Sequence, residues 1–119
     1  MKRGKMYIAG PVFGLTQEDI RVRFARGVEL ARAENYRPVS AIEVHPAAHI
    51  GQCPPGRKGM EDHNEGCHLR ADLMALLGCQ AMLLLRGWQT SWGSKLELSV
   101  ATAAGLYICF ESNGELIWA

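Results

Sequence analysis

The sequence predicts a small α/β fold, a Rossmann-like doubly wound parallel sheet with helices on both faces. Short apolar runs alternate with stretches in which apolar residues recur every three or four positions, and this alternation is typical of the class. Residues 81–85 are continuously apolar, as expected of a central strand covered on both sides. We also expect a C-terminal hairpin strand and a long lid loop. At 119 residues, the chain 1–119 fits a single domain.

The first elements are a strand and a helix. Residues 5–9 form a short apolar run that stops at Gly10 and Pro11, which indicates a buried strand followed by a loop. Thr16 is a suitable N-cap for a helix that should end near Asn35. Four apolar residues at helical spacing predict its buried stripe: Ile20, Phe24, Val28 and Ala31.

After a weak second strand at residues 36–39, neither apolar runs nor apolar residues at helical spacing continue. The segment 40–66 is interrupted by prolines and glycines, namely Pro46, Gly51, Pro54, Pro55, Gly56 and Gly59. Unpatterned segments of this length inside compact domains are usually lids or binding loops. We therefore predict a lid over residues 40–66.

The second half of the chain predicts two more helices and three strands. The helix before residue 78 ends at Gly78 and should bury one face made of Leu69, Leu73, Leu76 and Leu77. After the strand at 81–85, the next helix is marked by Leu96, Val100 and Ala103 or Ala104. Residues 106–110 follow as a buried strand. Asn113 and Gly114 then predict a hairpin turn into a last strand at 115–118.

Composition and charge exclude several classes of protein. A formal net charge of +1 argues against a dedicated nucleic-acid binder. No apolar run approaches the roughly 20 residues that a membrane span needs, and no signal-peptide pattern follows the basic N-terminus. We therefore expect a cytoplasmic protein with reduced thiols at Cys53, Cys67, Cys79 and Cys109. Three basic residues on the first helix are interpreted as a solvated face: Arg21, Arg23 and Arg26.

Two loops should follow the carboxyl ends of strands, where open α/β sheets bind their ligands. One starts at Gly10, and the other spans residues 86–94 and leads into the helix that contains Glu97. Trp88 and Trp92 in the second loop are predicted to be exposed platforms for a flat base or a sugar. The free N–H groups at the start of the helix form a natural anion site.

The carboxylates allow two interpretations on composition alone. Glu97 lies three residues after Ser94, so the pair can be a capping box with no further function. It can equally be a catalytic carboxylate. Asp72 can likewise be an ordinary helix acid or part of a site.

Several short motifs occur in a distinctive order along the chain. They are Tyr-Ile-Ala-Gly-Pro at residues 7–11, Asp72 and Leu73 before the central strand, Gly87 and Trp88, and Ser-Trp-Gly-Ser-Lys-Leu-Glu-Leu at residues 91–98, with Ala101 and Gly105. In this order they resemble the nucleoside 2-deoxyribosyltransferase-like family, above all its short phage and bacterial members. The most specific motif is Ser-x-Gly-x-x-x-Glu at the start of a helix. The resemblance covers nearly the whole chain outside the lid.

The resemblance implies an activity and a set of catalytic residues. Glu97 would be the nucleophile that attacks the anomeric carbon of a ribosyl or deoxyribosyl substrate. Asp72 would handle the base or its proton, and Tyr7 would orient the Glu97 carboxylate. Ser91 matches the branch that cleaves nucleoside 5′-monophosphates, which favours a nucleotide over a nucleoside. The substrate-binding residues would be Gly10, Pro11, Phe13, Trp88, Ser91, Gly93 and Ser94.

The resemblance also implies that the protein uses no cofactor and no metal. It further implies a homodimer or larger homo-oligomer, for which the exposed tryptophans and the helix at residues 69–77 offer a surface.

Two positions depart from the family pattern. Related enzymes often have an acid eight residues after Asp72, where this chain has Gln80, so base protonation would fall to Asp72 or to the lid, with His63 as a candidate. Lys95, two residues before Glu97, either pairs with phosphate or is an exposed surface residue of the helix without a functional role.

Histidines and cysteines cluster in and beside the lid: His45, His49, Cys53, His63, Cys67 and His68. Their spacing lacks the pairs with two intervening residues that are most diagnostic of zinc. We therefore expect substrate-facing lid residues or an oligomer contact here, with a zinc site as the less favoured interpretation.

Three classes of function remain open at this level. The favoured one is an enzyme that cleaves or transfers the N-glycosidic bond of a nucleoside 5′-monophosphate or deoxynucleoside. The alternatives are a non-catalytic nucleotide-binding module, such as a sensor or scavenger of signalling nucleotides, and a structural domain that binds a partner. The sequence leaves the base and the sugar undetermined.

Overall fold

The structure is a computed structural model that describes residues 3–46 and 65–119. The described strands are β1 (Lys5–Ala9), β2 (Arg37–Ser40), β3 (Ala81–Leu84), β4 (Tyr107–Ser112) and β5 (Glu115–Trp118). The helices are α1 (Gln17–Ala33), α2 (Glu65–Leu77) and α3 (Trp92–Ala103), with short 3-10 turns η1 (Ala41–Glu43) and η2 (Trp88–Thr90). Most of the predicted lid, residues 47–64, lies outside the described residues.

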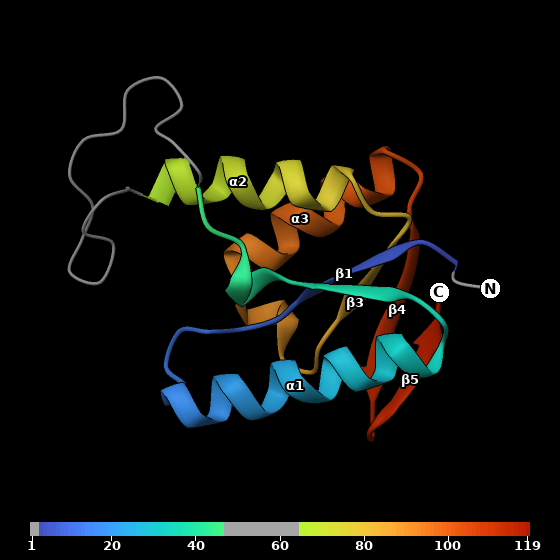
Figure 1. Ribbon diagram of the computed structural model, residues 1–119. Coiled ribbons are helices and arrows are strands. Elements are labelled where there is room, and N and C mark those ends of the chain that lie inside the picture. The colour runs from blue at the N-terminus through green and yellow to red at the C-terminus, as the bar shows by residue number, and fades with distance from the viewer. Residues whose placement is uncertain (1–2, 47–64) are drawn as a thin grey trace.

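The strands form one sheet in the order β2-β1-β3-β4-β5. The first four strands in this order are parallel, and β5 is antiparallel to β4. Helix α1 covers one face of the sheet, and α2 and α3 cover the other (Figure 1). The predicted α/β class, with its mainly parallel doubly wound sheet and C-terminal hairpin strand, is confirmed.

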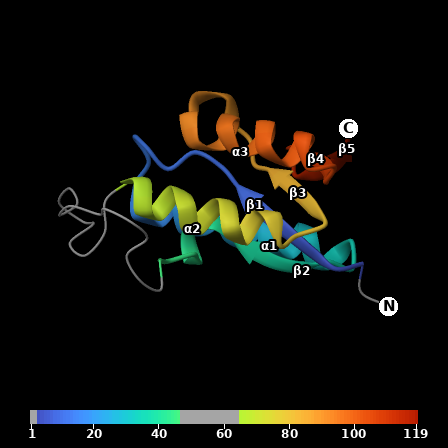
Figure 2. The same ribbon diagram turned by 90° about the horizontal axis from the view of Figure 1, so that it is seen from above.

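The strand order creates a crevice at one end of the sheet. The chain passes from β1 to β2 at one edge and then returns to β3 on the other side of β1. Connections that leave a sheet in opposite directions separate above the carboxyl ends of the strands, and this switch point is where doubly wound folds bind ligands. Helices α2 and α3 pack side by side over the same face of the sheet (Figure 2).

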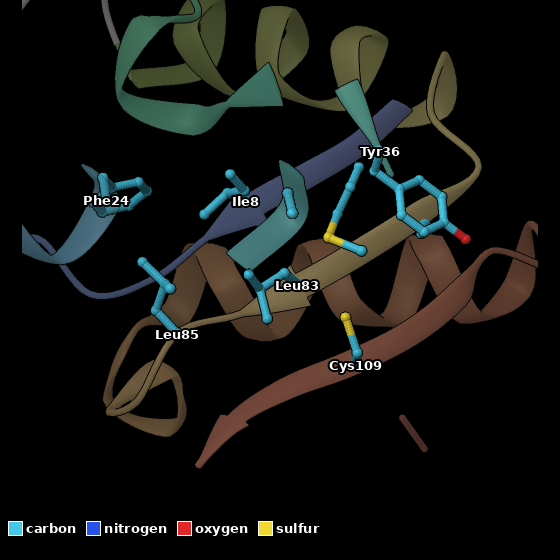
Figure 3. Close-up of a cluster of buried hydrophobic side chains, with 9 residues drawn as sticks. Ile8, Phe24, Tyr36, Leu83, Leu85 and Cys109 are labelled. Atoms are coloured by element: carbon cyan, nitrogen blue, oxygen red, sulfur yellow. The ribbon is translucent and has the colours of Figure 1, made fainter. Parts of the chain in front are cut away.

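Alternation along β1 and β3 divides the core into two layers. Ile8, Leu83 and Leu85 pack toward Phe24 of α1, as Figure 3 shows. The intervening residues, among them Tyr7, face α2 and α3. Alternate residues of one strand therefore pack against different helices, one set against α1 and the other against α2 and α3.

Gly27 allows α1 to lie close to the sheet. A Cβ atom at this position would be 2.8 Å from Cγ2 of Ile8 and 2.9 Å from Cδ2 of Leu85. Such distances are shorter than side-chain contacts allow. The predicted stripe of α1 is otherwise confirmed, with Phe24 and Ala31 buried and Ile20 and Val28 packed against them.

The buried faces of the other two helices differ from the expected ones. In α2, Leu76 is buried, but Leu77 is 56 % exposed because it is turned about 100° from Leu76 around the helix axis. In α3, the buried residues are Ser94, Glu97 and Ala101, while Ala103 and Ala104 are exposed. Contact with β3 and β4 determines which side of α3 is buried, and that side includes a glutamate.

Two local predictions agree with the structure. Asn113 and Gly114 both have positive φ (52° and 80°) and form the hairpin turn that pairs Ser112 with Glu115. The described cysteines, Cys67, Cys79 and Cys109, are buried free thiols. Cys53 lies outside the described residues.

No helix in the described ranges is both long and apolar enough to cross a membrane.

Candidate active site

An open cleft of about 910 Å³ lies beyond the carboxyl ends of β1 and β2. Its walls come from Gly10 after β1, the first turns of α1, the segment after β2, the side of α2 and the start of α3. The volume is in the range of pockets that hold small molecules. The cleft therefore occupies the switch point that the strand order predicts.

The central contact of the cleft joins Tyr7 and Glu97. The fully buried Tyr7 hydroxyl donates a short hydrogen bond to Oε2 of Glu97, which lines the cleft and is 6 % exposed. Burial raises the pKa of Glu97, and the Tyr7 hydrogen bond partly lowers it again. Burial, together with the charges of Glu97 and Asp72, raises the pKa of Tyr7. Tyr7 therefore stays protonated and acts as a hydrogen-bond donor to the glutamate.

Asp72 contributes a second carboxyl group to the same cleft from α2. Burial and repulsion from Glu97 raise its pKa to about 7. Unlike Glu97, Asp72 accepts no hydrogen bond from a group in the described part of the chain. The tyrosine therefore favours negative charge on Glu97, and the proton is retained on Asp72.

The capping interpretation of Glu97 is wrong. The N-cap of α3 is Ser91, whose Oγ accepts a hydrogen bond of 3.2 Å from the N–H of Ser94. Glu97 lies in the second turn of the helix, where its side chain bonds to Tyr7 instead of a free backbone N–H group. No capping role competes with a chemical role for this carboxylate.

The predicted substrate-binding residues separate into two groups. Gly10, Ser91, Gly93 and Ser94 line the cleft. Three others do not line it within the described residues, namely Pro11, which is buried, Phe13, which is 87 % exposed, and Trp88.

The prediction that Trp88 is an exposed platform is wrong. Its ring is half-buried and packs at 5.7 Å from the Phe110 ring, centroid to centroid. Trp92 is 69 % exposed, as predicted, but it does not belong to the described wall of the cleft. Neither indole therefore forms a face of the cleft.

Gln80 and Lys95, the two positions that depart from the family pattern, both lie away from the cleft. Oε1 of Gln80 accepts a hydrogen bond of 2.7 Å from the N–H of Lys5, at the amino ends of β1 and β3. Position 80 therefore lies at the opposite end of the strands from the cleft. Lys95 is exposed on α3 outside the described cleft wall.

Sequence reasoning missed an ion pair at the mouth of the cleft. Arg21 and Glu18 of α1 form a salt bridge of 2.5 Å, and both line the cleft. The Arg21 side chain is 69 % exposed, which agrees with the predicted solvated face, but its place in the cleft wall was not predicted. The missed signal is its position between Ile20 and Phe24, since a residue beside the apolar stripe lies at the edge of the buried face.

The metal interpretation gains no support from the described residues. His45 and His68 line the cleft and Cys67 is buried, but no group of three or more potential ligands occurs within the described ranges. His49, Cys53 and His63, including the proposed proton-donor role of His63, lie outside the described residues.

The assembled groups are suited to acid–base and nucleophilic chemistry. A carboxyl group that accepts a hydrogen bond from a neutral phenol lies in the same cleft as a second carboxyl group, whose pKa is raised to about 7. Two carboxyl groups whose environments differ in this way can take the two roles that glycosidic bond cleavage requires.

Comparisons with curated proteins and with solved structures give no significant match. A family model described as a domain of unknown function, DUF4406, matches residues 4–110, a span that contains Tyr7, Asp72 and Glu97. Because this match covers most of the chain, the protein belongs to the DUF4406 family.

Proposed function

We propose that this protein cleaves or transfers the N-glycosidic bond of a nucleoside 5′-monophosphate or deoxynucleoside, with Glu97 as the nucleophile. The observation that carries this proposal is the hydrogen bond from Tyr7 to Glu97 in a cleft shared with Asp72. The resemblance to nucleoside 2-deoxyribosyltransferases assigns roles to the same three residues and gives independent support.

The first step forms a covalent intermediate. An oxygen of the ionised Glu97 carboxylate attacks C1′ of the sugar while the bond from C1′ to the base nitrogen breaks. The base leaves with the bonding electron pair and takes the proton of the Asp72 carboxyl group. The products of this step are the free base, a glycosyl ester on Glu97 and an ionised Asp72.

The second step releases the sugar. Asp72, now a carboxylate, accepts a proton from water or from an acceptor base, and the deprotonated oxygen or nitrogen attacks C1′. The ester bond to Glu97 breaks and the carboxylate is restored. Water as the acceptor gives hydrolysis, and a second base gives transfer.

The start of α3 and the Arg21 side chain support a phosphate-bearing substrate. The first N–H groups of a helix have no intrahelical acceptor, and although the Ser94 N–H bonds to Oγ of Ser91, the start of α3 lies in the cleft wall at Ser91 and Gly93. The ion pair between Arg21 and Glu18 is exposed, so it contributes little stability. A substrate phosphate can therefore replace Glu18 as the partner of Arg21.

The test is incubation of the protein with a panel of nucleosides and 5′-monophosphates, followed by chromatography of the released base. We expect release from at least one substrate, loss of about 1,000-fold or more in Glu97→Gln, and an unchanged rate in Glu29→Gln, a control at an exposed acid of α1. Mass spectrometry of acid-quenched enzyme should detect a glycosyl group on the peptide that contains Glu97. Full activity in Glu97→Gln would refute the assignment.

The same panel separates catalysis from binding. If the protein is a nucleotide sensor or scavenger, ligand recovered from denatured protein is intact and no base appears. That outcome would contradict the proposed function and favour the binding module.

We further propose that the protein acts in the cytoplasm as a homodimer or larger homo-oligomer. Large exposed apolar side chains on α2 and α3 support self-association, namely Met74, Leu77 and Trp92. Light scattering coupled to gel filtration tests this. We expect a mass of at least twice 13.1 kDa, reduced to 13.1 kDa when Leu77 is replaced by Glu. A wild-type monomer would exclude self-association.

A further inference from the structure

A second pocket, of about 290 Å³, lies outside the cleft. Its walls come from α1, from the loop after β3, and from β4 with the turn that joins it to β5. The residues of α1 that line it differ from those that line the cleft. Three segments that are distant in the sequence therefore meet around this pocket.

Arginine side chains dominate the pocket. Arg23 and Arg26 extend from α1, and Arg86 lies in the loop after β3. Within the described residues, the only acid in the pocket wall is Glu111 of β4. Three guanidinium groups face one carboxylate, so the pocket has a net charge of +2.

The single carboxylate is already engaged. Glu111 is 14 % exposed in its side chain, and its Oε2 lies 3.5 Å from Nε of Arg26. Its Oε1 accepts a hydrogen bond of 3.1 Å from the backbone N–H of Arg86. Neither Arg23 nor Arg86 has a carboxylate partner for its guanidinium in the described part of the chain.

Two of the arginines, both on α1, contact neighbouring segments of the fold. A guanidinium nitrogen of Arg23 lies 3.4 Å from the Arg86 carbonyl oxygen, which it contacts as a weak donor. Arg26 lies against the turn at Gly114, where a Cβ atom would collide with its guanidinium. These contacts join the α1 side of the pocket to the loop after β3 and to the hairpin turn.

We propose that this pocket binds the phosphate group of a small molecule. The charge of +2 matches the charge of −1.5 to −2 that a phosphate monoester carries near pH 7. Arginine presents N–H groups in a planar fork that pairs with two phosphate oxygens at once. A pocket of this volume is at the lower end of the range for small-molecule sites, which favours one phosphate-bearing metabolite.

The experiment is a calorimetric titration of the full-length protein with inorganic phosphate at constant ionic strength. We expect Arg23→Ala and Arg86→Ala each to weaken phosphate binding by about tenfold or more. Glu111→Gln should tighten it, because the amide keeps an acceptor for the Arg86 N–H and removes a carboxylate charge that repels phosphate. A conservative variant, Arg86→Lys, retains the charge but loses the fork, so it should weaken binding less than Arg86→Ala.

Matched controls separate this pocket from the cleft. Arg32→Ala, at an exposed arginine near the end of α1, should leave phosphate affinity unchanged. Arg21→Ala, in the cleft wall, should remove only phosphate bound in the cleft and should leave the binding that depends on Arg23 and Arg86 intact. Loss of binding in Arg21→Ala with no change in Arg23→Ala and Arg86→Ala would overturn the proposal, as would the absence of any phosphate binding.

The proposal is independent of the glycosidic activity. Base release measured on Arg23→Ala and Arg86→Ala should match the wild type, since neither side chain lines the cleft. Failure of phosphate binding therefore leaves the enzyme assignment intact, and failure of base release leaves the pocket intact.

Discussion

Tyr7 and Glu97 are 90 residues apart in the chain, yet the hydroxyl of the tyrosine donates a hydrogen bond to Oε2 of the glutamate. The bond connects β1 to the second turn of α3 across the α2 and α3 face of the sheet. No hydrogen bond to the other oxygen, Oε1, is present in the described part of the chain. The contact therefore orients the carboxylate and leaves one of its oxygens available to a ligand.

Removal of this hydrogen bond should change the acidic limb of the activity profile. Tyr7→Phe takes away the group that lowers the pKa of Glu97, while the burial that raises this pKa remains. We expect base release to fall about 10- to 100-fold at pH 6, with the acidic limb moved to higher pH. The measurement is kcat/KM against pH, with Tyr107→Phe, at an exposed tyrosine of β4, as the control. An acidic limb at its wild-type position would show that Tyr7 does not act on Glu97.

Asp72 should set the alkaline limb of the same profile. Its pKa is raised to about 7, so the acid form that protonates the leaving base disappears above that pH. We expect kcat/KM to fall tenfold per pH unit above about pH 7 in the wild type. Asp72→Asn should lower the plateau and remove this limb. An alkaline limb that persists in Asp72→Asn would assign the proton donor to another group.

Asp72 should also make the fold less stable as the pH rises. In the folded state its pKa is about 7 and in the unfolded state close to 3.8, so the folded protein binds the proton more tightly between these values and stability falls as pH rises from about 4 to 7. At pH 8 the cost is on the order of 2 kcal/mol, after allowance for solvent screening at this half-buried position.

Thermal melting at pH 3 and pH 8 measures the cost of ionised Asp72. We expect Asp72→Asn to melt at a higher temperature than the wild type at pH 8 and at nearly the same temperature at pH 3, where the carboxyl group is neutral in both states. Glu29→Gln should show no such pH-dependent difference. An Asp72→Asn protein less stable than the wild type at pH 8 would contradict the prediction.

Two helical glycines provide a matched test of packing. Gly27→Ala should destabilise the fold by about 1–3 kcal/mol, because its Cβ would overlap Ile8 and Leu85. Gly93→Ala places the same methyl group in open space at the start of α3. The free energy of unfolding of this variant should therefore not be lower than that of the wild type. Denaturant unfolding measures both. Equal stability of the two variants would show that α1 can move away from the sheet without cost.

The sequence predicts most of the secondary structure because the relevant information is local. Asn113 and Gly114 readily adopt positive φ, so the final hairpin follows from two adjacent residues. The spacing of Phe24 and Ala31 predicts which side of α1 is buried. The continuous apolar run at residues 81–85 predicts a central strand, and β3 is flanked by β1 and β4.

The content of the site depends on contacts that no local pattern encodes. The side of α3 that packs on the sheet includes Glu97, a charged residue that the apolar residues marking this helix do not predict to be buried. Trp88 lies in the loop after β3 but packs on Phe110 of β4, so its position in a loop does not make it exposed.

Asp72 and Gln80 are eight residues apart, but Asp72 lines the cleft from α2 whereas Gln80 lies just before β3, at the amino ends of the strands, because α2 ends between them at Leu77. By itself, the sequence determined the strands, the helices and the chemistry available to the protein. Only the tertiary structure decided which polar groups share the cleft, because strand order and helix packing bring together residues that are distant along the chain.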